Sequence, residues 1–150
     1  DGAEAFGAST VCVLVMQGDT VGAANLGDSG FCLLRRAESG RLEVLLRSDE
    51  QTHQWNCPFQ LTRLPVALRR RVPQHLQPDH ASDSKRYRFE VQAGDLLLAY
   101  SDGVSDNVHD TELLDIVNKE AADRCSLPPA AQVARALATW ARQRSMDPTA

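Results

Sequence analysis

The segment Gly94–Asn107, GDLLLAYSDGVSDN, joins a fully apolar run to a cluster of acidic turn residues. Its apolar part, Leu96–Tyr100, has the length of a buried strand, and the Gly-Asp pair before it is a turn signal. The run stops abruptly at a Ser-Asp-Gly turn. The sequence therefore predicts a strand whose end carries two carboxylates, Asp102 and Asp106.

Further strands are predicted upstream of this segment. The run 8–16, ASTVCVLVM, is β-branched and apolar almost throughout, which predicts a central strand covered on both faces. Short turns that contain glycine then separate three more runs, at 20–26, 31–35 and 42–47, which predict an antiparallel meander. Tyr87–Val91 alternates apolar with charged residues, so we expect a strand with one face in solvent.

Two helices are predicted after the strands. Asp110 is the expected N-cap of the first helix. The second helix is expected to open at Pro128-Pro129, and its apolar stripe consists of Ala130, Val133, Ala134, Leu137, Trp140 and Ala141. The segment 54–85 contains four prolines and predicts a long irregular surface segment. Strands in succession followed by helices favour an α+β domain of antiparallel sheets over a doubly wound parallel sheet.

The composition is that of an ordinary globular protein and argues against several classes of function. A net charge of -4 gives no basic surplus for a nucleic-acid partner, and the basic run 69–71 is expected to be a solvated loop. No apolar stretch approaches the roughly 20 residues of a membrane span. The four cysteines are widely spaced, so we expect neither a disulfide nor a zinc site. The length suits one compact domain, and because the first residue is Asp1 we expect a removed leader or a piece of a longer protein.

Two acidic turns are the candidates for chemistry. Gly27–Gly30 (GDSG) and Ser101–Asp106 (SDGVSD) each follow an apolar strand directly. A carboxylate at the end of a rigid strand is held in place, as Mg²⁺ or Mn²⁺ requires of its oxygen ligands. An Asp beside Gly is also a common turn residue, so each motif alone leaves a purely structural role open.

Three motifs occur in order along the chain: GAST at 7–10, NLGDSG at 25–30, and the segment quoted first. Together they resemble the PPM, or type 2C, family of metal-dependent protein phosphatases. Two further stretches, RSDEQ at 47–51 and NCPFQL at 56–61, are similar to the branch that includes mitochondrial and chloroplast members. The resemblance runs from residue 6 to residue 147 and thins in the middle of the chain.

The resemblance implies a four-layer α-β-β-α sandwich of antiparallel sheets, of which residues 1–150 would form the central and C-terminal portion. It implies two or more Mn²⁺ or Mg²⁺ ions that activate a water for attack on phosphoserine or phosphothreonine. Asp102 matches the catalytic, metal-bridging ligand, with Gly103 beside it, and Asp106 and Asp28 match positions of an additional metal. The implied partner is a phosphoprotein. We expect a monomer with an intracellular location, mitochondrial or plastid in that branch and cytoplasmic otherwise.

The chain also departs from the family pattern. The family's upstream Asp-Gly-x-Gly-Gly motif and downstream Asp-Asp pair are both absent from these residues. We therefore expect an incomplete metal site and no activity from this chain by itself. The alternative function is a catalytically inactive phosphatase-like module that binds or regulates.

The GDSG turn also resembles the nucleophile turn of chymotrypsin-like proteases. Phe31 stands where the third glycine of that turn would be, and the upstream histidine motif of such proteases is absent. We therefore expect Ser29 to have a structural role. None of the four histidines matches a proton donor of the phosphatase family, and we expect them to be loop or surface residues.

Overall fold

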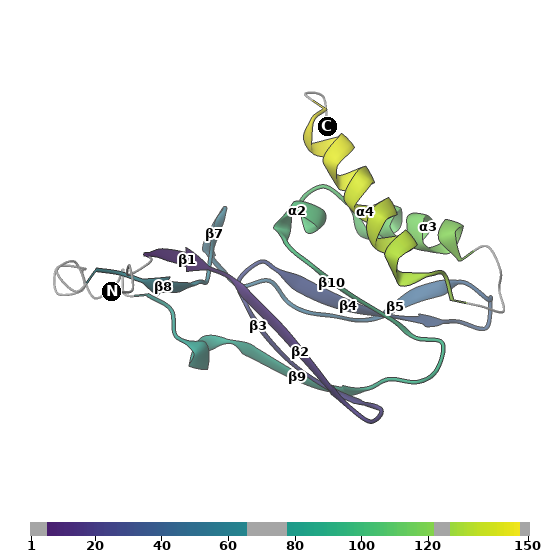
Figure 1. Ribbon diagram of the computed structural model, residues 1–150, viewed down its shortest axis with the longest axis horizontal. Helices are drawn as coiled ribbons and strands as arrows, with labels where there is room; N and C mark the ends of the chain where they lie inside the picture. Colours follow the sequence, from purple (N-terminus) through teal and green to yellow (C-terminus); the bar gives the residue numbers. More distant parts are fainter. Residues whose placement is uncertain (1–5, 66–77, 122–126, 148–150) are drawn as a thin grey trace. The chain divides into compact units, whose positions relative to one another are not determined.

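The computed structural model describes residues 6–65, 78–121 and 127–147. Its helices and strands, shown in Figure 1, fall into two compact units, and the chain passes between the units three times. Unit 1 consists of Asp1–Ser29 and Asp49–Phe89, and unit 2 consists of Gly30–Ser48 and Glu90–Ala150.

Unit 2 is built on an antiparallel sheet of three strands in the order β10-β4-β5. The strands are β4 (Gly30–Arg36), β5 (Leu42–Arg47) and β10 (Leu96–Tyr100). β4 is central, and every residue from Gly30 to Leu34 is buried, as expected for an apolar run without alternation. β10 pairs with β4 so that Leu96 lies opposite Leu34 and Tyr100 lies opposite Gly30.

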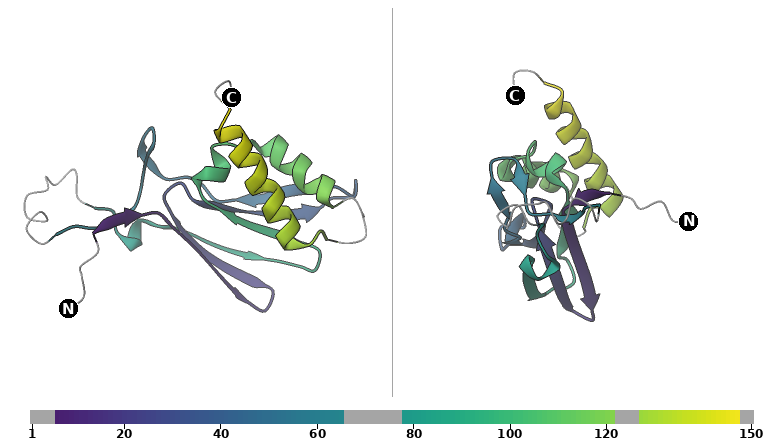
Figure 2. Two further views of the ribbon diagram at one scale, coloured as in Figure 1. Left: turned by 45° about the horizontal axis from the view of Figure 1, so that its top comes forward. Right: turned by 90° about the vertical axis from the view of Figure 1, so that its left-hand side faces the viewer.

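Three helices complete the described part of unit 2: α2 (Asp102–Ser105), α3 (Asp110–Glu120) and α4 (Ala130–Ser145). Figures 1 and 2 show α3 and α4 lying over one face of the sheet. The core is apolar and buried, and it includes Cys32, Leu34, Leu42, Leu96, Val108, Leu113, Val117, Val133, Leu137 and Ala141. Removal of this apolar surface from water is the main favourable contribution to the stability of the unit.

Unit 1 contains a second three-stranded sheet, in the order β2-β3-β9, and two short ribbons that pair β1 with β8 and β6 with β7. Its elements are β1 (Gly7–Ser9), β2 (Val11–Gln17), β3 (Thr20–Leu26), β6 (Thr52–Gln54), β7 (Cys57–Pro58), β8 (Leu61–Arg63), η2 (Ala81–Asp83) and β9 (Lys85–Glu90). β2 and β3 form an antiparallel hairpin that turns at Gly18, whose φ is 62°. Glycine adopts this left-handed backbone without the steric cost of a Cβ.

The prediction of an α+β fold with antiparallel sheets is confirmed. The strands expected at 20–26 and 42–47 have the predicted bounds, and β9 shows the predicted alternation of half-buried Tyr87 and Phe89 with exposed charged residues. A meander that continues from 20–26 into 31–35 was wrongly predicted, because β3 and β4 lie in different sheets. A turn signal in the sequence does not tell whether the next strand pairs with the previous one.

The prediction of a central strand at 8–16 is also wrong. The run is divided between β1 and β2, and β2 is an edge strand that pairs with β3 alone among the described residues. Val13, Val15 and Met16 are 48%, 62% and 69% exposed. An apolar run indicates that a strand is suited to burial, but it does not indicate which segment of the chain covers the strand.

The segment 54–85 is more regular than predicted. Its described part contains β7, β8 and η2, and β6 ends at its first residue. The elements are short because Pro58 ends β7 and Pro65 follows β8, and proline removes a backbone donor that a longer ladder would need. The basic run 69–71 and His75 lie outside the described residues.

The two predicted helices are present, with corrections at their surfaces. His109 rather than Asp110 is the N-cap of α3, and its N–H donates to Glu112 Oε2 at 3.0 Å. The buried stripe of α4 is narrower than predicted and consists of Val133, Leu137 and Ala141. Ala130 and Ala134 are exposed and Trp140 is 43% exposed. One row of side chains four residues apart is all that α4 packs into the core.

Cys12, Cys32 and Cys57 are free thiols, and Cys125 lies outside the described residues. Burial raises the pKa of the Cys32 thiol to about 11, so this side chain behaves as a small apolar group of the core. Within the described ranges, no helix combines the length and the apolar character needed to cross a membrane.

Candidate metal site

The end of β10 positions Asp102. Tyr100 is the last residue of the strand, and Ser101 continues with an extended backbone as the N-cap of α2. Val104 N–H donates to Ser101 O at 2.9 Å, which closes the first turn around Asp102. The Asp102 side chain is exposed, and its Oδ1 accepts the Gly103 N–H at 2.7 Å. Among the described residues Oδ2 has no hydrogen-bonding partner, so one carboxylate oxygen is fixed and the other is available.

Asp106 lies one helical turn beyond Asp102. It is the C-cap of α2, and its N–H donates to Asp102 O at 2.8 Å. Gly103 is held from both sides, because its N–H donates to Asp102 and its carbonyl accepts Asn107 Nδ2 at 3.1 Å. The structure therefore places Asp102, Gly103 and Asp106 on one short turn, and a common centre for the two carboxylates stays a prediction.

Asp28 occupies the turn that follows β3 in unit 1. Gly27 before it has a φ of 101°, and a Cβ at this position would lie 2.5 Å from Phe59 O and from Thr10 Cγ2. Gln51 N–H donates to Gly27 O at 3.0 Å. Asp28 itself is half-buried. The turn is held tightly, and only glycine fits at Gly27.

Ser29 has the structural contacts expected for it. Its Oγ lies 2.9 Å from Thr10 Oγ1, in a hydrogen bond that ties the turn to the residue between β1 and β2. The neighbouring buried Asn25 donates from Nδ2 to Gly27 O and Asp49 O at 3.4 and 3.3 Å. The hydroxyl of Ser29 is therefore part of the hydrogen bonding that holds the turn.

The predicted ligands do not form a complete metal centre in the described part of the chain. No group of three or more His, Cys, Asp or Glu side chains is close enough there to hold a metal ion. Asp102 and Asp106 belong to unit 2 and Asp28 belongs to unit 1, so a site that combines all three stays a prediction. The donors are oxygens, which fits Mg²⁺ or Mn²⁺, but two carboxylates fall short of the ligands that such ions need.

Arg47 contacts residues on both sides of this turn, and no role was predicted for it from the sequence. Its Nη1 donates to the Tyr100 hydroxyl at 2.8 Å, and its Nη2 forms an ion pair with Asp110 Oδ1 at 2.6 Å. The only signal in the sequence was its place at the start of RSDEQ.

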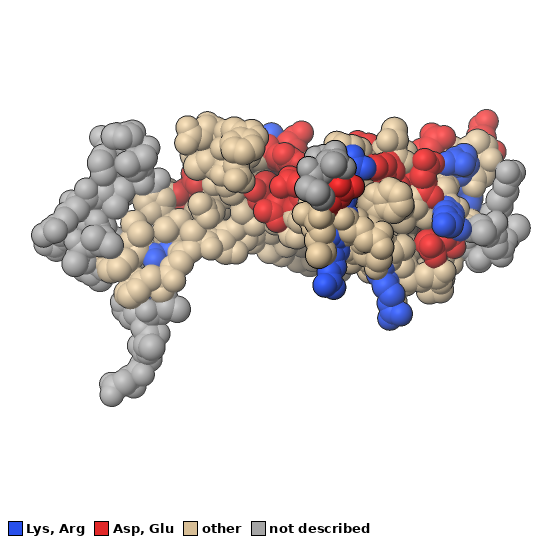
Figure 3. All heavy atoms as spheres, turned by 90° about the horizontal axis from the view of Figure 1, so that it is seen from above, with Lys and Arg blue, Asp and Glu red and all other residues tan. Residues whose placement is uncertain are grey.

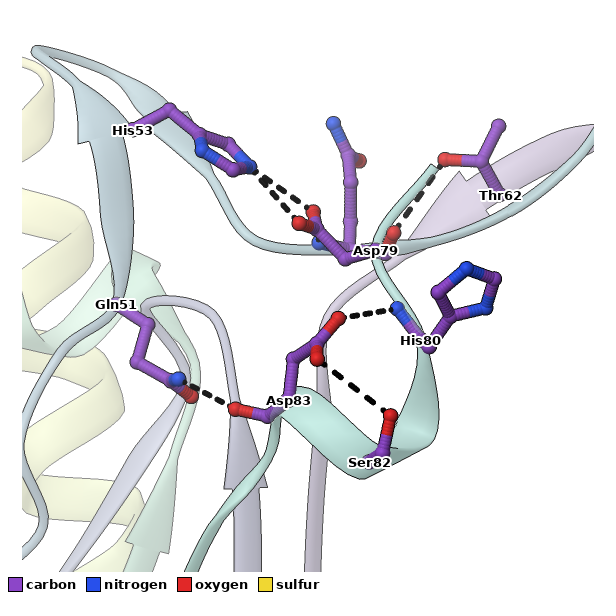
Figure 4. A network of polar contacts seen from close by, with 8 residues as sticks. Gln51, His53, Thr62, Asp79, His80, Ser82 and Asp83 are labelled. Carbon is purple, nitrogen blue, oxygen red and sulfur yellow. Dashed lines mark hydrogen bonds and ion pairs between the residues drawn. The ribbon is translucent and has the colours of Figure 1, made fainter. Parts of the chain in front are cut away.

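A second polar cluster lies in unit 1 and is shown in Figure 4. His53 Nε2 lies 2.9 and 3.1 Å from the two carboxylate oxygens of Asp79, and Asp79 Oδ2 also accepts the Gln60 N–H at 2.9 Å. The His53 ring stacks on Phe59 with centroids 4.0 Å apart. These contacts link β6 to the chain near β8, and they account for His53 as a structural residue.

Several charged side chains of unit 2 form ion pairs with one another. Figure 3, which views the helices from outside, shows acidic and basic side chains interspersed over this unit. Arg144 pairs with Glu112 at 2.9 Å and Arg41 pairs with Asp115 at 3.3 Å. The His109 N–H, and next the charge of Arg144, lower the pKa of Glu112. This face offers no single-sign field that would attract a polyanion.

No family model matches the sequence. The chain is 37% identical over 145 residues to "Protein phosphatase PTC7 homolog" of Danio rerio and 36% identical over 145 residues to the protein of that name from Homo sapiens. Each match covers 95% of this chain but only 45% and 44% of the relative. The chain thus spans less than half the length of the curated relatives it matches.

Solved structures share the fold. The photosystem II phosphatase PBCP matches with a TM-score of 0.74 and 23% identity, over 96% of this chain and 48% of that chain. The catalytic domain of the serine threonine protein phosphatase PstP, in complex with 2 manganese ions, matches with a TM-score of 0.59 and 22% identity, over 93% of this chain and 55% of that chain. Sequence relatives and fold agree with the three ordered motifs, and the chain belongs to the PPM, or type 2C, protein phosphatase family.

Proposed function

We propose that the protein to which this chain belongs is a metal-dependent phosphatase of phosphoserine and phosphothreonine in proteins. The observation that carries the proposal is the geometry of Asp102, which is exposed at the end of β10 with Oδ1 held by the Gly103 N–H. A carboxylate fixed in this way is a suitable ligand for a hard cation. The sequence relatives are named as protein phosphatases.

The residues of this chain have distinct roles in the proposal. Asp102 would be the central ligand of Mn²⁺ or Mg²⁺, Asp106 would add a carboxylate from the same turn, and Asp28 would add one from unit 1. Gly103 orients Asp102 through its N–H. When bound, a cluster of two or more ions supplies Lewis acidity that activates water and offsets the charge of the phosphoryl group. The remaining ligands would come from the rest of the protein.

The test compares the whole protein with this 150-residue chain on a phosphothreonine peptide, with Mn²⁺ and with a chelator. We expect the whole protein to hydrolyse the peptide only when Mn²⁺ is present. We expect no hydrolysis by the 150-residue chain by itself. Asp102→Asn should abolish the metal-dependent turnover while circular dichroism stays unchanged. Asp19→Asn, in the exposed turn between β2 and β3, is the control and should keep full activity. Unchanged turnover in Asp102→Asn would contradict the proposal.

A second candidate function is a phosphatase-like module without catalysis. It is favoured by the lack, within the described ranges, of a group of three or more metal-binding side chains. In that case the whole protein would bind the phosphopeptide without hydrolysing it, with or without Mn²⁺. Binding measured by fluorescence anisotropy, beside the turnover assay, separates the two functions.

We infer an intracellular location, in a mitochondrion or plastid or otherwise in the cytoplasm, and a monomeric whole protein. The location rests on the stretches RSDEQ and NCPFQL, which are similar to the organellar branch, and one fold neighbour is a photosystem II phosphatase. Cell fractionation of a tagged full-length protein tests the location. Sedimentation of the purified whole protein tests the monomer.

A further inference from the structure

Arg47 contacts both ends of the segment that carries Asp102 and Asp106. Tyr100, which receives the hydrogen bond from Nη1, is the last residue of β10 and lies just before the segment. Asp110, which is paired with Nη2, is the first residue of α3 and lies just after it. One guanidinium thus contacts the residue before and the residue after the segment 101–109. The rigid planar fork of arginine suits two partners in different directions.

The Tyr100 end of this arrangement is closely packed. Tyr100 lies opposite Gly30 on β4, and a Cβ at Gly30 would approach Tyr100 Cε2 to 3.2 Å and Ser48 Oγ to 2.8 Å. Ser48 Oγ accepts the Phe31 N–H at 2.9 Å, so the hydroxyl cannot move away freely. Arg47 Cζ lies 5.7 Å from the centroid of the Tyr100 ring. The ring that receives the Arg47 hydrogen bond is therefore held in one position.

The hydrogen-bonding capacity of the Arg47 guanidinium is only partly used. Its Nε and Nη2 are buried and have no hydrogen-bonding partner among the described residues, so the contact of Nη2 with Asp110 is an ion pair without hydrogen-bond geometry. A buried unpaired donor costs about 1–3 kcal/mol. The contacts of the guanidinium that remain are the hydrogen bond to Tyr100 and the ion pair with Asp110, one at each end of the segment.

We propose that Arg47 is a positioning residue for the metal site: it fixes both ends of the segment 101–109 and so holds the Asp102 carboxylate in the geometry that binds Mn²⁺ or Mg²⁺. This inference rests on the proposed function. In this proposal Arg47 acts through Tyr100 and Asp110 and is not itself a metal ligand. Residues that orient metal ligands in this way typically contribute 10–100-fold to metal affinity.

A second arginine pair in unit 2 provides a matched control. Arg35, on the central strand β4, donates from Nε and Nη2 to the two oxygens of Asp95 at 2.8 and 2.7 Å. The Arg35 side chain is 32% exposed and that of Arg47 is 29% exposed. Asp95 precedes β10 and therefore lies at the other end of the strand from Asp102. Loss of Arg35 removes the partner of Asp95, which is 4% exposed, whereas the Asp110 partner of Arg47 is 64% exposed. Of these two arginines, Arg47 alone contacts the ends of the segment 101–109.

The experiment measures Mn²⁺ affinity of the full-length protein by calorimetry, with the melting temperature and hydrogen exchange of the metal-free protein alongside. We compare Arg47→Met with Arg35→Met, and we include Arg47→Lys and Tyr100→Phe. Arg47→Met should weaken Mn²⁺ binding by about tenfold or more, and it should speed amide exchange in 101–109. Arg35→Met should leave both properties at the wild-type level, although it removes the more buried of the two ion pairs and should lower the melting temperature at least as much as Arg47→Met does.

The other variants keep the test decisive if Arg47→Met fails to fold. Tyr100→Phe keeps the ring and removes only the hydroxyl that accepts from Arg47, so it should weaken Mn²⁺ binding less than Arg47→Met. Arg47→Lys can reach one partner at a time and should restore binding only in part. Equal Mn²⁺ affinity in wild type, Tyr100→Phe and Arg47→Lys would overturn the inference, as would equal losses in Arg47→Met and Arg35→Met. A wild-type protein that binds no Mn²⁺ would instead refute the proposed function.

Discussion

Gly27 is the residue on which the turn between β3 and β4 depends. Its φ of 101° is unfavourable for any residue with a Cβ, and a Cβ would also meet Phe59 O and Thr10 Cγ2 at 2.5 Å. We expect Gly27→Ala to lower the free energy of unfolding by about 2–4 kcal/mol, as measured by urea denaturation. Gly18→Ala is the control: its φ is 62° but nothing lies within 4 Å, so the loss should be about 1 kcal/mol. Equal losses would show that steric contact at Gly27 is not decisive.

Asp95 links stability to pH. The hydrogen bond from Arg35 is the largest cause that lowers the pKa of Asp95 below its ordinary value of 3.8. A carboxyl with a lowered folded-state pKa contributes stability above its unfolded pKa and loses that contribution as the pH falls through the folded value. Asp95→Asn should therefore destabilise the protein by about 2 kcal/mol at neutral pH, and the difference from wild type should shrink below about pH 4.

Unfolding by urea at several pH values checks this prediction. Asp115→Asn is the matched control, because its carboxylate is 78% exposed and pairs with Arg41 at 3.3 Å. It should change stability by about 0.5 kcal/mol or less. A difference between wild type and Asp95→Asn that stays constant down to pH 2 would contradict the linkage.

At the scale of single residues, the candidate metal ligands could be predicted from the sequence, whereas the residue that holds their segment could not. Asp102 and Asp106 stand out because they end an apolar run, and the turn that joins them is local in sequence. Arg47 contacts Tyr100 and Asp110 across two strands and a helix. Such contacts depend on the order and register of the strands in the sheet, which cannot be read from local residue patterns.

At the scale of elements, α4 contributes to the core through a single row of side chains. Leu137 is 6% exposed, whereas Trp140 is 43% exposed despite its greater apolar surface. We expect Leu137→Ala to cost about 2–5 kcal/mol of stability and Trp140→Ala about 1 kcal/mol or less. Thermal unfolding of the two variants tests this order. A larger effect of Trp140→Ala would show that the wide apolar stripe predicted from the sequence packs in solution.

The bounds of elements were predicted well where the local pattern is strong. β3 and β5 lie between turn residues that interrupt their apolar runs and have the predicted bounds. β9 shows the predicted alternation, but it begins at Lys85 and ends at Glu90 instead of spanning 87–91. The helices α3 and α4 follow the 3.6-residue period. Pairing was harder, since β2 and β4 are both apolar runs yet one is an edge strand and the other is central. The difference lies in partners that are distant in sequence.

At the scale of the whole molecule, the exposed face of β2 affects behaviour in solution. β2 is an edge strand in the described residues, and it exposes Val13, Val15 and Met16. An exposed apolar edge strand favours pairing with another chain. We expect the 150-residue chain by itself to associate with increasing concentration in sedimentation velocity experiments, and Val15→Lys to reduce this association. Glu90→Lys, on the strand at the other edge of that sheet, is a control that should have little effect.

The three passages of the chain between units have a consequence for synthesis on the ribosome. The hairpin of β4 and β5 leaves the exit tunnel long before β10 and the helices that cover it. During that interval the buried side chains of Cys32, Leu34 and Leu42 lack their core partners from the later part of unit 2. Unit 1 is likewise interrupted, because its first strands wait for β9 while the hairpin of unit 2 is made. Unit 2 cannot finish folding during translation until all of unit 1 has been made, because its second part begins only at Glu90, so the hairpin of β4 and β5 needs protection from aggregation during that interval.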